Sequence, residues 1–475
     1  MKILYAASEA LPFAASGGLA DVAGSLPAAL TREGAVCRVV LPLYSQISET
    51  FKNRMRYITH FNVPLSWRNQ YCGLFEVEEN GIRYYLLDNE YYFKRGGIYG
   101  FYDDAERFIF FSKAVLEMLT VLDYVPDIIH CNDWQTAMIP VFLNVFYRGI
   151  EKFRRIKTVF TIHNIQYQGK YGMEVATDIC GLPDYAVPMI TYENSVNMMK
   201  GGIEQCDRIT TVSPSYSREI LESWFGFGLD KLLREKSYKL CGILNGIDTN
   251  GYNPACDPEI FRNYSAEDPA GKAVNKQMLQ QTLGLEVSAD TPVIAMVTRL
   301  VGMKGLDLVR YIFDELMREK VQFVVLGSGD YAYESFFSEM AARYPGRVAA
   351  RGGFIPDLAH KIYAGADLFL MPSKSEPCGI SQMVALRYGT LPIVRETGGL
   401  RDTITDLGAE EGGNGFTFQT YNAHDMLGAI RRALVLYNDR PAWKSALKNA
   451  MACDFSWERS AKEYMALFES LKSSY

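Results

Sequence analysis

One short pattern, Gly-Gly-Leu-x-Asp, occurs twice in this chain, at residues 17–21 and again at residues 398–402. At both places an apolar run typical of a strand precedes the glycines, and apolar residues at helical spacing follow them, as far as Leu407 in the second copy. Paired glycines at a strand-to-helix turn let the backbone approach a ligand closely, and the first N–H groups of the helix attract an anion. The copies are too far apart for a tandem repeat. They predict two αβ halves and an enzyme that handles a phosphorylated substrate.

The length and composition limit the classes of protein to which the chain can belong. A chain of 475 residues exceeds what one hydrophobic core usually supports and predicts two domains. Its net charge of −6 and its lack of a lysine- or arginine-rich tract argue against a nucleic-acid partner. Nine scattered cysteines without a C-x-x-C pair fit a reducing compartment better than a zinc site or a disulfide framework.

The hydropathy pattern argues against a membrane protein. No apolar stretch approaches the roughly 20 residues that a membrane helix needs. The first residues, Met1-Lys2-Ile3-Leu4, lead directly into a strand and do not resemble a signal peptide. We therefore expect a cytoplasmic protein without a membrane partner.

Short apolar runs alternate with amphipathic helices along most of the chain, which predicts parallel sheets. Such strands are expected at residues 36–42, 127–130, 157–161, 208–212, 293–297, 321–326, 348–350 and 368–371. Residues 56–98 instead alternate like antiparallel strands and are interpreted as an insertion.

A break in this pattern predicts where the two halves join. Asn, Gly, Pro and Asp dominate from Leu244 to Pro258, a composition typical of a linker. We therefore expect an α/β fold of two doubly wound, Rossmann-like domains facing a central cleft. The first would comprise residues 1–245 and the second residues 246–454, with a C-terminal helix at 455–475 packing back on the first.

Two basic residues follow a buried strand of the second half. Arg299 lies at the end of the strand and Lys304 at the entry of the next helix. A guanidinium grips phosphate with two hydrogen bonds, and a lysine adds a movable positive charge. The alternative interpretation is a surface ion-pair patch around a helix start. The glycine turns favour phosphate.

A carboxylate follows another strand of the second half. Glu376 precedes Pro377, which pushes it into extended geometry just outside a helix. In that position it could orient sugar hydroxyls or a developing charge. The alternative role is a first-turn charge that complements the helix dipole.

Two polar clusters lie at strand ends in the first half. His163 ends one strand, but a lone histidine is more often structural than catalytic, and no ligand spacing around it indicates a metal. It could instead hydrogen-bond a substrate hydroxyl or phosphate. Asp133 and Trp134 end another strand, a pairing of carboxylate and aromatic ring that occurs in sugar sites and also at domain interfaces.

Missing motifs narrow the chemistry further. The chain has no Asp-x-Asp triplet, no G-x-x-x-x-G-K-[ST] phosphate loop and no G-x-S-x-G nucleophile elbow. These absences favour a metal-free transfer from a nucleotide-activated donor.

Together the motifs resemble the bacterial glycogen synthase and plant starch synthase family from Met1 to the last helix. The residues that carry the resemblance are Ser8-Glu9, Gly17-Gly18-Leu19-Ala20-Asp21, Asn132-Asp133-Trp134, Thr161-Ile162-His163-Asn164, residues 242–248, Arg299 with Lys304, Glu376-Pro377-Cys378-Gly379 and Thr397-Gly398-Gly399-Leu400. The resemblance implies a GT-B fold and transfer of glucose from ADP-glucose to the non-reducing end of an α-1,4-glucan (glycogen or a maltooligosaccharide). It also implies retention at the anomeric carbon, with neither metal nor cofactor.

The resemblance also implies roles for particular residues. Glu376, His163, Arg299 and Lys304 would be the catalytic group, with the leaving phosphate taking the acceptor's proton. Amides of Gly18 and Gly399 would complete a diphosphate cradle, and Phe354 would face the adenine. The implied donor site comprises Ala15, Gly17, Gly18, Asn245, Arg299, Lys304, Phe354, Cys378, Gly379, Thr397, Gly398, Gly399 and Leu400. The implied acceptor site comprises Glu9, Asp21, Asp133 and Trp134.

One departure from the family pattern leaves alternatives open. Ala15 stands where the family usually has a lysine that contacts donor phosphate. Ser375 and Met303 are milder departures, where the family often has Phe and Gln. The alternatives are a GT-B enzyme that uses UDP-glucose and a catalytically silent glucan-binding paralogue.

Overall fold

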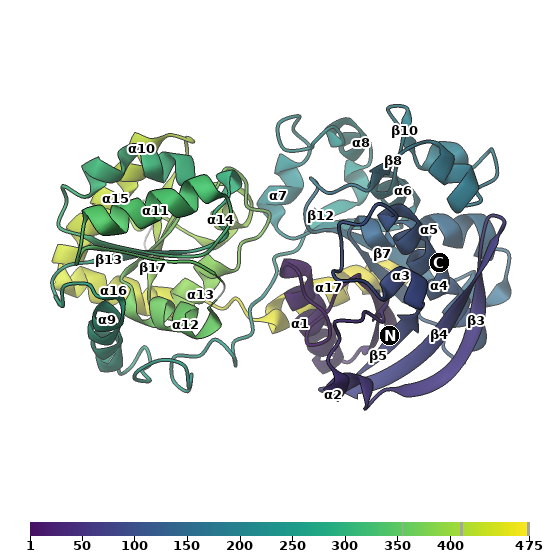
Figure 1. Cartoon of the computed structure of the whole chain (residues 1–475), viewed down its shortest axis with the longest axis horizontal. Helices are drawn as coiled ribbons and strands as arrows, with labels where there is room; N and C mark the ends of the chain where they lie inside the picture. The colour runs from purple at the N-terminus through teal and green to yellow at the C-terminus, as the bar shows by residue number, and fades with distance from the viewer. Residues whose placement is uncertain (354, 409–411, 473–475) are drawn as a thin grey trace. The chain divides into compact units, whose positions relative to one another are not determined.

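The structure is a computed structural model that describes residues 1–353, 355–408 and 412–472 (Figure 1). It divides into two compact units. Unit 1 comprises Met1–Gly246 with Trp457–Tyr475, and unit 2 comprises Ile247–Ser456. The sequence had placed the boundary after residue 245. No helix in the described part of the chain is long and apolar enough to cross a membrane.

Unit 1 is organised around a nine-stranded sheet. Its strands in spatial order are β12 (Leu240–Gly242), β11 (Arg208–Thr211), β7 (Lys157–Ile162), β6 (Ile128–Asn132), β1 (Lys2–Ala6), β2 (Val36–Pro42), β5 (Ile82–Asp88), β4 (Arg68–Glu79) and β3 (Arg56–Leu65). The seven strands from β12 to β5 are parallel. Their apolar side chains are buried because helices cover both faces, as the continuous hydrophobic runs predict.

The antiparallel strands predicted within residues 56–98 are confirmed as far as Asp88, where the helix α3 follows. β4 pairs antiparallel with both β5 and β3, so residues 56–88 form a meander that widens the sheet at one edge. A second, three-stranded antiparallel sheet contains β8 (Lys170–Tyr171), β10 (Ser195–Asn197) and β9 (Thr191–Tyr192).

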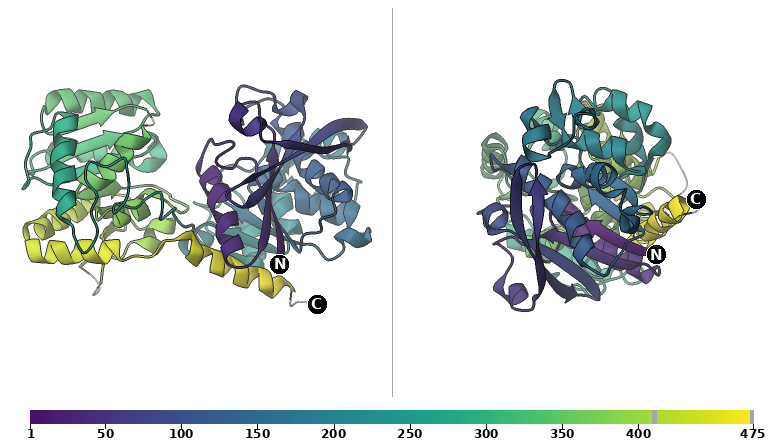
Figure 2. Two further views of the ribbon diagram at one scale, coloured as in Figure 1. Left: turned by 90° about the horizontal axis from the view of Figure 1, so that it is seen from below. Right: turned by 90° about the vertical axis from the view of Figure 1, so that its right-hand side faces the viewer.

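The helices of unit 1 come from both ends of the chain. They are α1 (Gly18–Arg32), α2 (Glu49–Lys52), α3 (Glu90–Phe93), α4 (Asp104–Val121), α5 (Met138–Phe142), α6 (Met198–Gln205), α7 (Pro214–Glu219), α8 (Asp230–Glu235) and α17 (Trp457–Lys472). α17, in yellow, packs beside α1, in purple (Figure 2). Its Tyr464 and Phe468 also contact the ring of His130 on β6.

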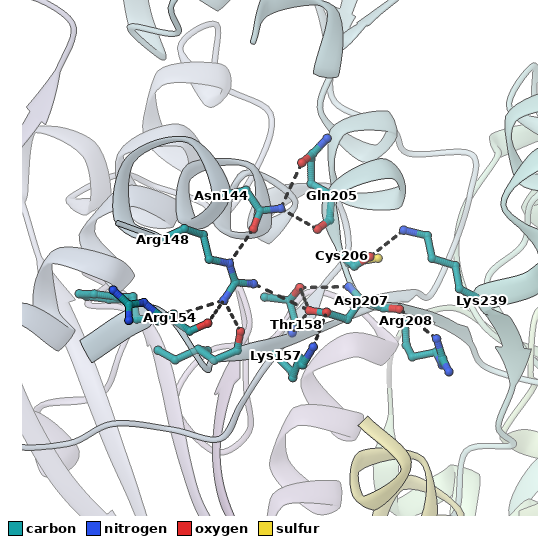
Figure 3. A network of polar contacts seen from close by, with 12 residues as sticks. Asn144, Arg148, Arg154, Lys157, Thr158, Gln205, Cys206, Asp207, Arg208 and Lys239 are labelled. Atoms are coloured by element: carbon teal, nitrogen blue, oxygen red, sulfur yellow. Dashed lines mark hydrogen bonds and ion pairs between the residues drawn. The ribbon is translucent and has the colours of Figure 1, made fainter. Parts of the chain in front are cut away.

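A polar network joins the amino ends of β7 and β11 (Figure 3). Asp207 accepts hydrogen bonds from the backbone amide and the hydroxyl of Thr158, and it forms an ion pair with Lys157. The Arg148 guanidinium donates to three backbone carbonyls and to Asn144. This network ties together the amino ends of these two parallel strands. The candidate functional residues of unit 1 lie at the opposite side of the sheet, where the parallel strands have their carboxyl ends.

Unit 2 contains a six-stranded parallel sheet. Its order is β15 (Val348–Arg351), β14 (Gln322–Leu326), β13 (Val293–Val297), β16 (Leu368–Met371), β17 (Leu391–Arg395) and β18 (Phe416–Phe418). Its helices are α9 (Ala270–Leu283), α10 (Leu306–Leu316), α11 (Tyr331–Arg343), α12 (Pro356–Gly365), α13 (Ser381–Arg387), α14 (Gly398–Thr403), α15 (Ala423–Asn438) and α16 (Arg440–Met451). α10 and α11 cover one face and α12, α13 and α16 the other (Figure 1).

One element differs from its sequence prediction. The helical spacing from Leu400 to Leu407 predicts a longer helix than α14, which ends at Thr403. The Asn414 side chain donates to the Thr403 carbonyl and accepts from the Thr405 amide, so it replaces the next helical turn. Ile404 is extended (φ −112°, ψ 120°) as a result.

Candidate active site

Three neighbouring strands of unit 1 end in polar residues at the same edge of the sheet. β1 leads to Ser8 and Glu9, β6 to Asp133, and β7 to His163. Because the carboxyl ends of parallel strands meet at one edge, ligands of doubly wound sheets bind there. Glu9, Asp133 and His163 come from three distant segments of the sequence, and the topology brings these segments together.

The first glycine turn encloses Glu9 and stays open to solvent. The Glu9 carboxylate accepts hydrogen bonds from the amides of Ser16 and Gly17. Burial raises the pKa of Glu9, and hydrogen bonds from the Ser16 hydroxyl and from these two amides oppose the rise. The Gly18 amide, at the start of α1, has no acceptor among the described residues. Ala15, Gly17, Gly18 and Asp21 are exposed in this unit, so a ligand can approach the turn.

His163 is held by a neighbouring strand end. Its Nε2 lies 2.9 Å from Oδ1 of Asn132, the last residue of β6. Its backbone amide donates to Asp133 Oδ1 at 2.8 Å. Burial lowers the pKa of the imidazole to about 3, so the ring is neutral near pH 7. A neutral ring can hydrogen-bond a substrate, but it cannot serve as a cationic anchor for phosphate.

Asp133 occupies a strained position beside Trp134. Its φ of 55° lies in the left-handed region, where non-glycine residues are uncommon. Burial raises the pKa of its carboxyl to about 7, although the amides of His163 and Asn164 oppose the rise. Perturbed carboxylates of this kind are concentrated at functional sites.

An aromatic groove opens next to Trp134. It has a volume of about 350 Å³, and its lining residues are Trp134, Gln166, Tyr167, Gln168, Gly169, Lys170, Tyr171 and Phe227. The rings of Trp134 and Tyr171 lie 5.9 Å apart at an angle of 56°. A Cβ on Gly169 would lie 2.6 Å from the Trp134 ring, so this glycine lets the loop pass close to the indole.

Asn245 follows β12 and carries an unsatisfied polar atom. The residue is buried, and its Oδ1 has no hydrogen-bond partner among the described residues. A buried acceptor without a partner is costly, so Oδ1 can accept a hydrogen bond from a ligand hydroxyl or from a water.

Unit 2 combines a paired lysine with an unpaired arginine. Lys304 Nζ lies 2.7 Å from Oε2 of Glu376, which also accepts from the Ser373 hydroxyl at 2.9 Å. Both residues of the ion pair are largely buried. Arg299 is exposed and forms no ion pair with any residue that the structure describes. Glu376 is thus a fixed carboxylate, and Arg299 is a cation available to a ligand.

The second glycine turn is packed against its own unit. A Cβ on Gly398 would lie 2.0 Å from the Glu376 carbonyl oxygen, and one on Gly399 would lie 2.0 Å from that of Cys378. Gly398 also has a φ of +46°. The Gly399 amide donates to the carbonyls of Glu376 and Pro377. This amide is therefore engaged in the fold and would have to give up these hydrogen bonds to take its expected place in a phosphate cradle.

The remaining expected donor residues lie around this turn. Cys378, Thr397 and Leu400 are buried, and the Leu400 side chain belongs to the hydrophobic core of unit 2. Gly379 has a φ of +74° and lies against the side chain of Gln382. Phe354, expected at the adenine, lies outside the described residues.

Some residues of the candidate site were not selected from the sequence. Ser373 holds Glu376, and the Tyr99 hydroxyl lies 2.7 Å from the Ser8 hydroxyl, next to Glu9. Tyr44 donates to the Ser8 carbonyl at 2.7 Å. Ser373 follows β16 and could have been found from that strand-end position. Tyr44 follows the parallel strand β2 and could have been found in the same way, whereas Tyr99 had no comparable signal because it reaches Ser8 from a distant loop.

Comparisons with known proteins decide the family. Residues 2–235 match the starch synthase catalytic domain, and residues 284–450 match the glycosyl transferases group 1 domain. Glycogen synthase from Bacillus cereus (strain B4264) is 52% identical over 99% of this chain and 100% of its own length. The chain belongs to the glycogen synthase and starch synthase family. Glycogen synthase from Geobacillus thermodenitrificans is 50% identical over 99% of this chain and 98% of its own length.

Solved structures confirm the GT-B fold of this family member. The catalytic domain of starch synthase IV from Arabidopsis thaliana, bound to ADP and acarbose, is 34% identical with a TM-score of 0.90, over 99% of both chains. Sucrose-phosphate synthase from Thermosynechococcus elongatus, at 17% identity and a TM-score of 0.63 over 100% of both chains, shares the fold alone. The chain is a glycosyltransferase, and its function is that of a glycogen synthase.

Proposed function

We propose that this chain transfers glucose from ADP-glucose to the non-reducing end of an α-1,4-glucan, with retention at the anomeric carbon. The observation that carries the proposal is the arrangement of charges in unit 2. Glu376 is fixed on one oxygen by Lys304 and Ser373, while Arg299 has no ion pair among the described residues. This is a set of groups for binding an anion and orienting a sugar.

Arg299 and Lys304 would bind the diphosphate of the donor. A guanidinium can form two hydrogen bonds with phosphate, and an ammonium can approach as a point charge. The bound ADP of the Arabidopsis starch synthase IV structure, a relative over the whole chain, supports an adenine nucleotide as the leaving group. The negative charge that develops on that leaving group is where fixed positive charges accelerate the reaction.

Glu376 would orient the transferred sugar rather than attack it. Its Oε2 already accepts from Lys304 and Ser373, which leaves Oε1 to accept from a sugar hydroxyl. A carboxylate held in an ion pair is a weak nucleophile. The acceptor hydroxyl would therefore attack on the face that the phosphate leaves, and the departing phosphate oxygen would take its proton. The new glycosidic bond would retain the configuration of the donor.

The groove beside Trp134 would bind the glucan acceptor. Sugar rings pack their apolar faces on aromatic side chains, and Trp134, Tyr167, Tyr171 and Phe227 supply such faces. Glu9, Asp21 and Asp133 would accept hydrogen bonds from glucan hydroxyls nearby. The acarbose of the Arabidopsis structure supports a glucan-like ligand in this family.

Release of ADP during incubation with ADP-glucose and glycogen tests this proposal directly. We expect ADP release, a product that α-1,4-specific enzymes digest, and full activity in EDTA. Glu376→Gln should lower kcat by at least about a hundredfold, since it removes a charge fixed for the transition state. Glu315→Gln, a matched change on α10 at an exposed ion pair with Arg431, should leave kcat unchanged. Normal turnover of Glu376→Gln would contradict the role of this carboxylate.

One observation favours a second candidate function. Ala15 is exposed at the first glycine turn and supplies no charge there. Weaker binding of the donor fits a glucan-binding protein that does not catalyse transfer, or an enzyme with a different nucleotide preference. Maltooligosaccharide binding without ADP release would favour the first, and faster reaction with UDP-glucose the second.

A further inference from the structure

Asn132 makes hydrogen bonds in two opposite directions from the end of β6. The residue is fully buried. Its Nδ2 faces the carbonyl oxygens of Ala6 and His130, at 3.0 and 3.3 Å. Its Oδ1 accepts from the Tyr5 hydroxyl at 3.0 Å and faces His163 Nε2 at 2.9 Å.

This set of partners determines which way the carboxamide points. Carbonyl oxygens only accept, so the NH₂ group must face Ala6 and His130. The amide oxygen must then face His163. Because that oxygen also only accepts, Nε2 of His163 must carry the ring proton and Nδ1 the lone pair. No hydrogen bond joins Nδ1 of His163 to any residue that the structure describes.

We propose that Asn132 is a positioning residue for glucosyl transfer, which fixes His163 as the Nε2–H tautomer and thereby presents Nδ1 as an acceptor for a substrate hydroxyl. This proposal rests on the proposed function and on the place of His163 in its catalytic group, which the family resemblance implies. The low pKa of His163 keeps Nδ1 unprotonated near pH 7, in agreement with an acceptor role.

A rigid set of buried side chains holds Asn132 in this orientation. Tyr5 donates to Oδ1, and its ring packs edge-on against His130 at 4.7 Å. His130 is itself enclosed by Tyr464 and Phe468 of α17 and contacts Thr161 at 2.6 Å. Since Asn132, Tyr5 and His130 are all fully buried, the orientation does not depend on solvent. The tautomer of His163 thus depends on packing that reaches to the C-terminal helix.

The competing explanation is that Asn132 only ties β6 to β1. Its loss would then lower stability but leave His163 and turnover unchanged. Thr158→Val provides a matched control for such a structural loss. Thr158 is a buried residue of β7 at the opposite edge of the same sheet, where its hydroxyl bonds Asp207 (Figure 3).

The test combines a tautomer measurement with kinetics. ¹⁵N-histidine NMR of the unliganded wild-type protein should show His163 as the Nε2–H tautomer, and His163→Ala should identify its signal. In Asn132→Leu the Nδ1–H tautomer should appear, and kcat should fall on the order of tenfold or more with a small change in donor KM. Thr158→Val should change neither the tautomer nor kcat. Combining Asn132→Leu with His163→Ala should slow the enzyme no further than His163→Ala alone.

Two results would overturn the positioning role. One is a wild-type His163 that carries its proton on Nδ1, which can be measured even if Asn132→Leu is insoluble. The other is an Asn132→Leu protein that keeps both the Nε2–H tautomer and its kcat. A wild-type protein that does not extend glucan from ADP-glucose would instead overturn the proposed function, a result distinct from the NMR reading.

Discussion

The two Gly-Gly-Leu-x-Asp turns share a sequence but need their glycines for different reasons. In unit 1 a Cβ on Gly18 would meet no atom within 4 Å, and the Gly18 amide has no acceptor among the described residues. In unit 2 a Cβ on Gly399 would collide with the Cys378 carbonyl, and the Gly399 amide is engaged. The first turn therefore leaves room for a ligand. The second permits close packing of its own unit.

The carboxylates near the two turns also differ in whether the fold already provides them with a partner. Glu376 in unit 2 is paired with Lys304. Asp133 in unit 1 has no ion pair in the described part of the chain, and burial raises the pKa of its carboxyl. A repeated motif therefore does not imply a repeated role. The role depends on which groups the surrounding fold has already satisfied.

The largest expected effect is on the packed turn. Gly399→Ala should destabilise the protein by on the order of 3 kcal/mol or more, because the new methyl group would lie 2.0 Å from a backbone oxygen that cannot move freely. Thermal unfolding and soluble yield measure this loss. A melting temperature equal to that of the wild type would show that the second turn is as open as the first.

The next largest effect should come from a charge added at the open turn. A lysine at position 15 could reach a donor phosphate, and a charged hydrogen bond contributes roughly 1.5–3 kcal/mol. Ala15→Lys should therefore tighten ADP-glucose binding by about tenfold or more and leave glucan affinity nearly unchanged. Calorimetric titration with each ligand measures both. An unchanged donor affinity would place this turn away from the phosphates.

A smaller effect is expected for a methyl group at the open turn. Gly18→Ala should leave stability unchanged or raise it by about 0.5 kcal/mol, since alanine restricts the unfolded chain and meets no neighbour. It should raise the donor KM by about threefold through crowding of the free amide, a change of roughly 0.7 kcal/mol. Steady-state kinetics and thermal unfolding of one sample separate the two readouts. A drop in melting temperature would contradict the open turn.

The last prediction concerns how the stability of the protein changes with pH. The folded protein holds the Asp133 proton up to about pH 7, whereas an unfolded aspartate releases it near pH 4. The native state thus binds more protons between these values, and this group's contribution to stability falls as pH rises through that window. Asp133→Asn should gain in melting temperature relative to wild type from pH 4.5 to 7.5. Melting temperatures of variant and wild type that change in parallel with pH would show that Asp133 is already ionised in the folded state.

The sequence predicts most strands of this fold to within one or two residues. The runs at 36–42, 293–297 and 368–371 coincide with β2, β13 and β16. Hydrophobic runs of parallel strands are local signals, so a single sequence contains them. The length of α14 was predicted wrongly because the side chain that ends it, Asn414, lies 11 residues beyond Thr403 in a loop.

For the candidate site, too, the sequence predicts some features and misses others. Strand-end polar residues such as Asp133, His163 and Glu376 were found because topology alone collects strand ends. Their partners were not found. Lys304 and Glu376 are separated by 72 residues, and both were selected for a ligand without any indication that they pair with each other. Whether an amide such as that of Gly399 is free is likewise decided by tertiary contacts that periodicity does not encode.

The return of α17 to unit 1 has a consequence for how the protein is made. The ribosome completes every strand of the nine-stranded sheet before residue 246, and then the whole of unit 2, before it synthesises the helix that encloses His130. During that interval the side of unit 1 that α17 covers is exposed, while unit 2 already has its full sequence. A nascent chain stalled near residue 456 would therefore carry a complete second unit attached to an unfinished first one.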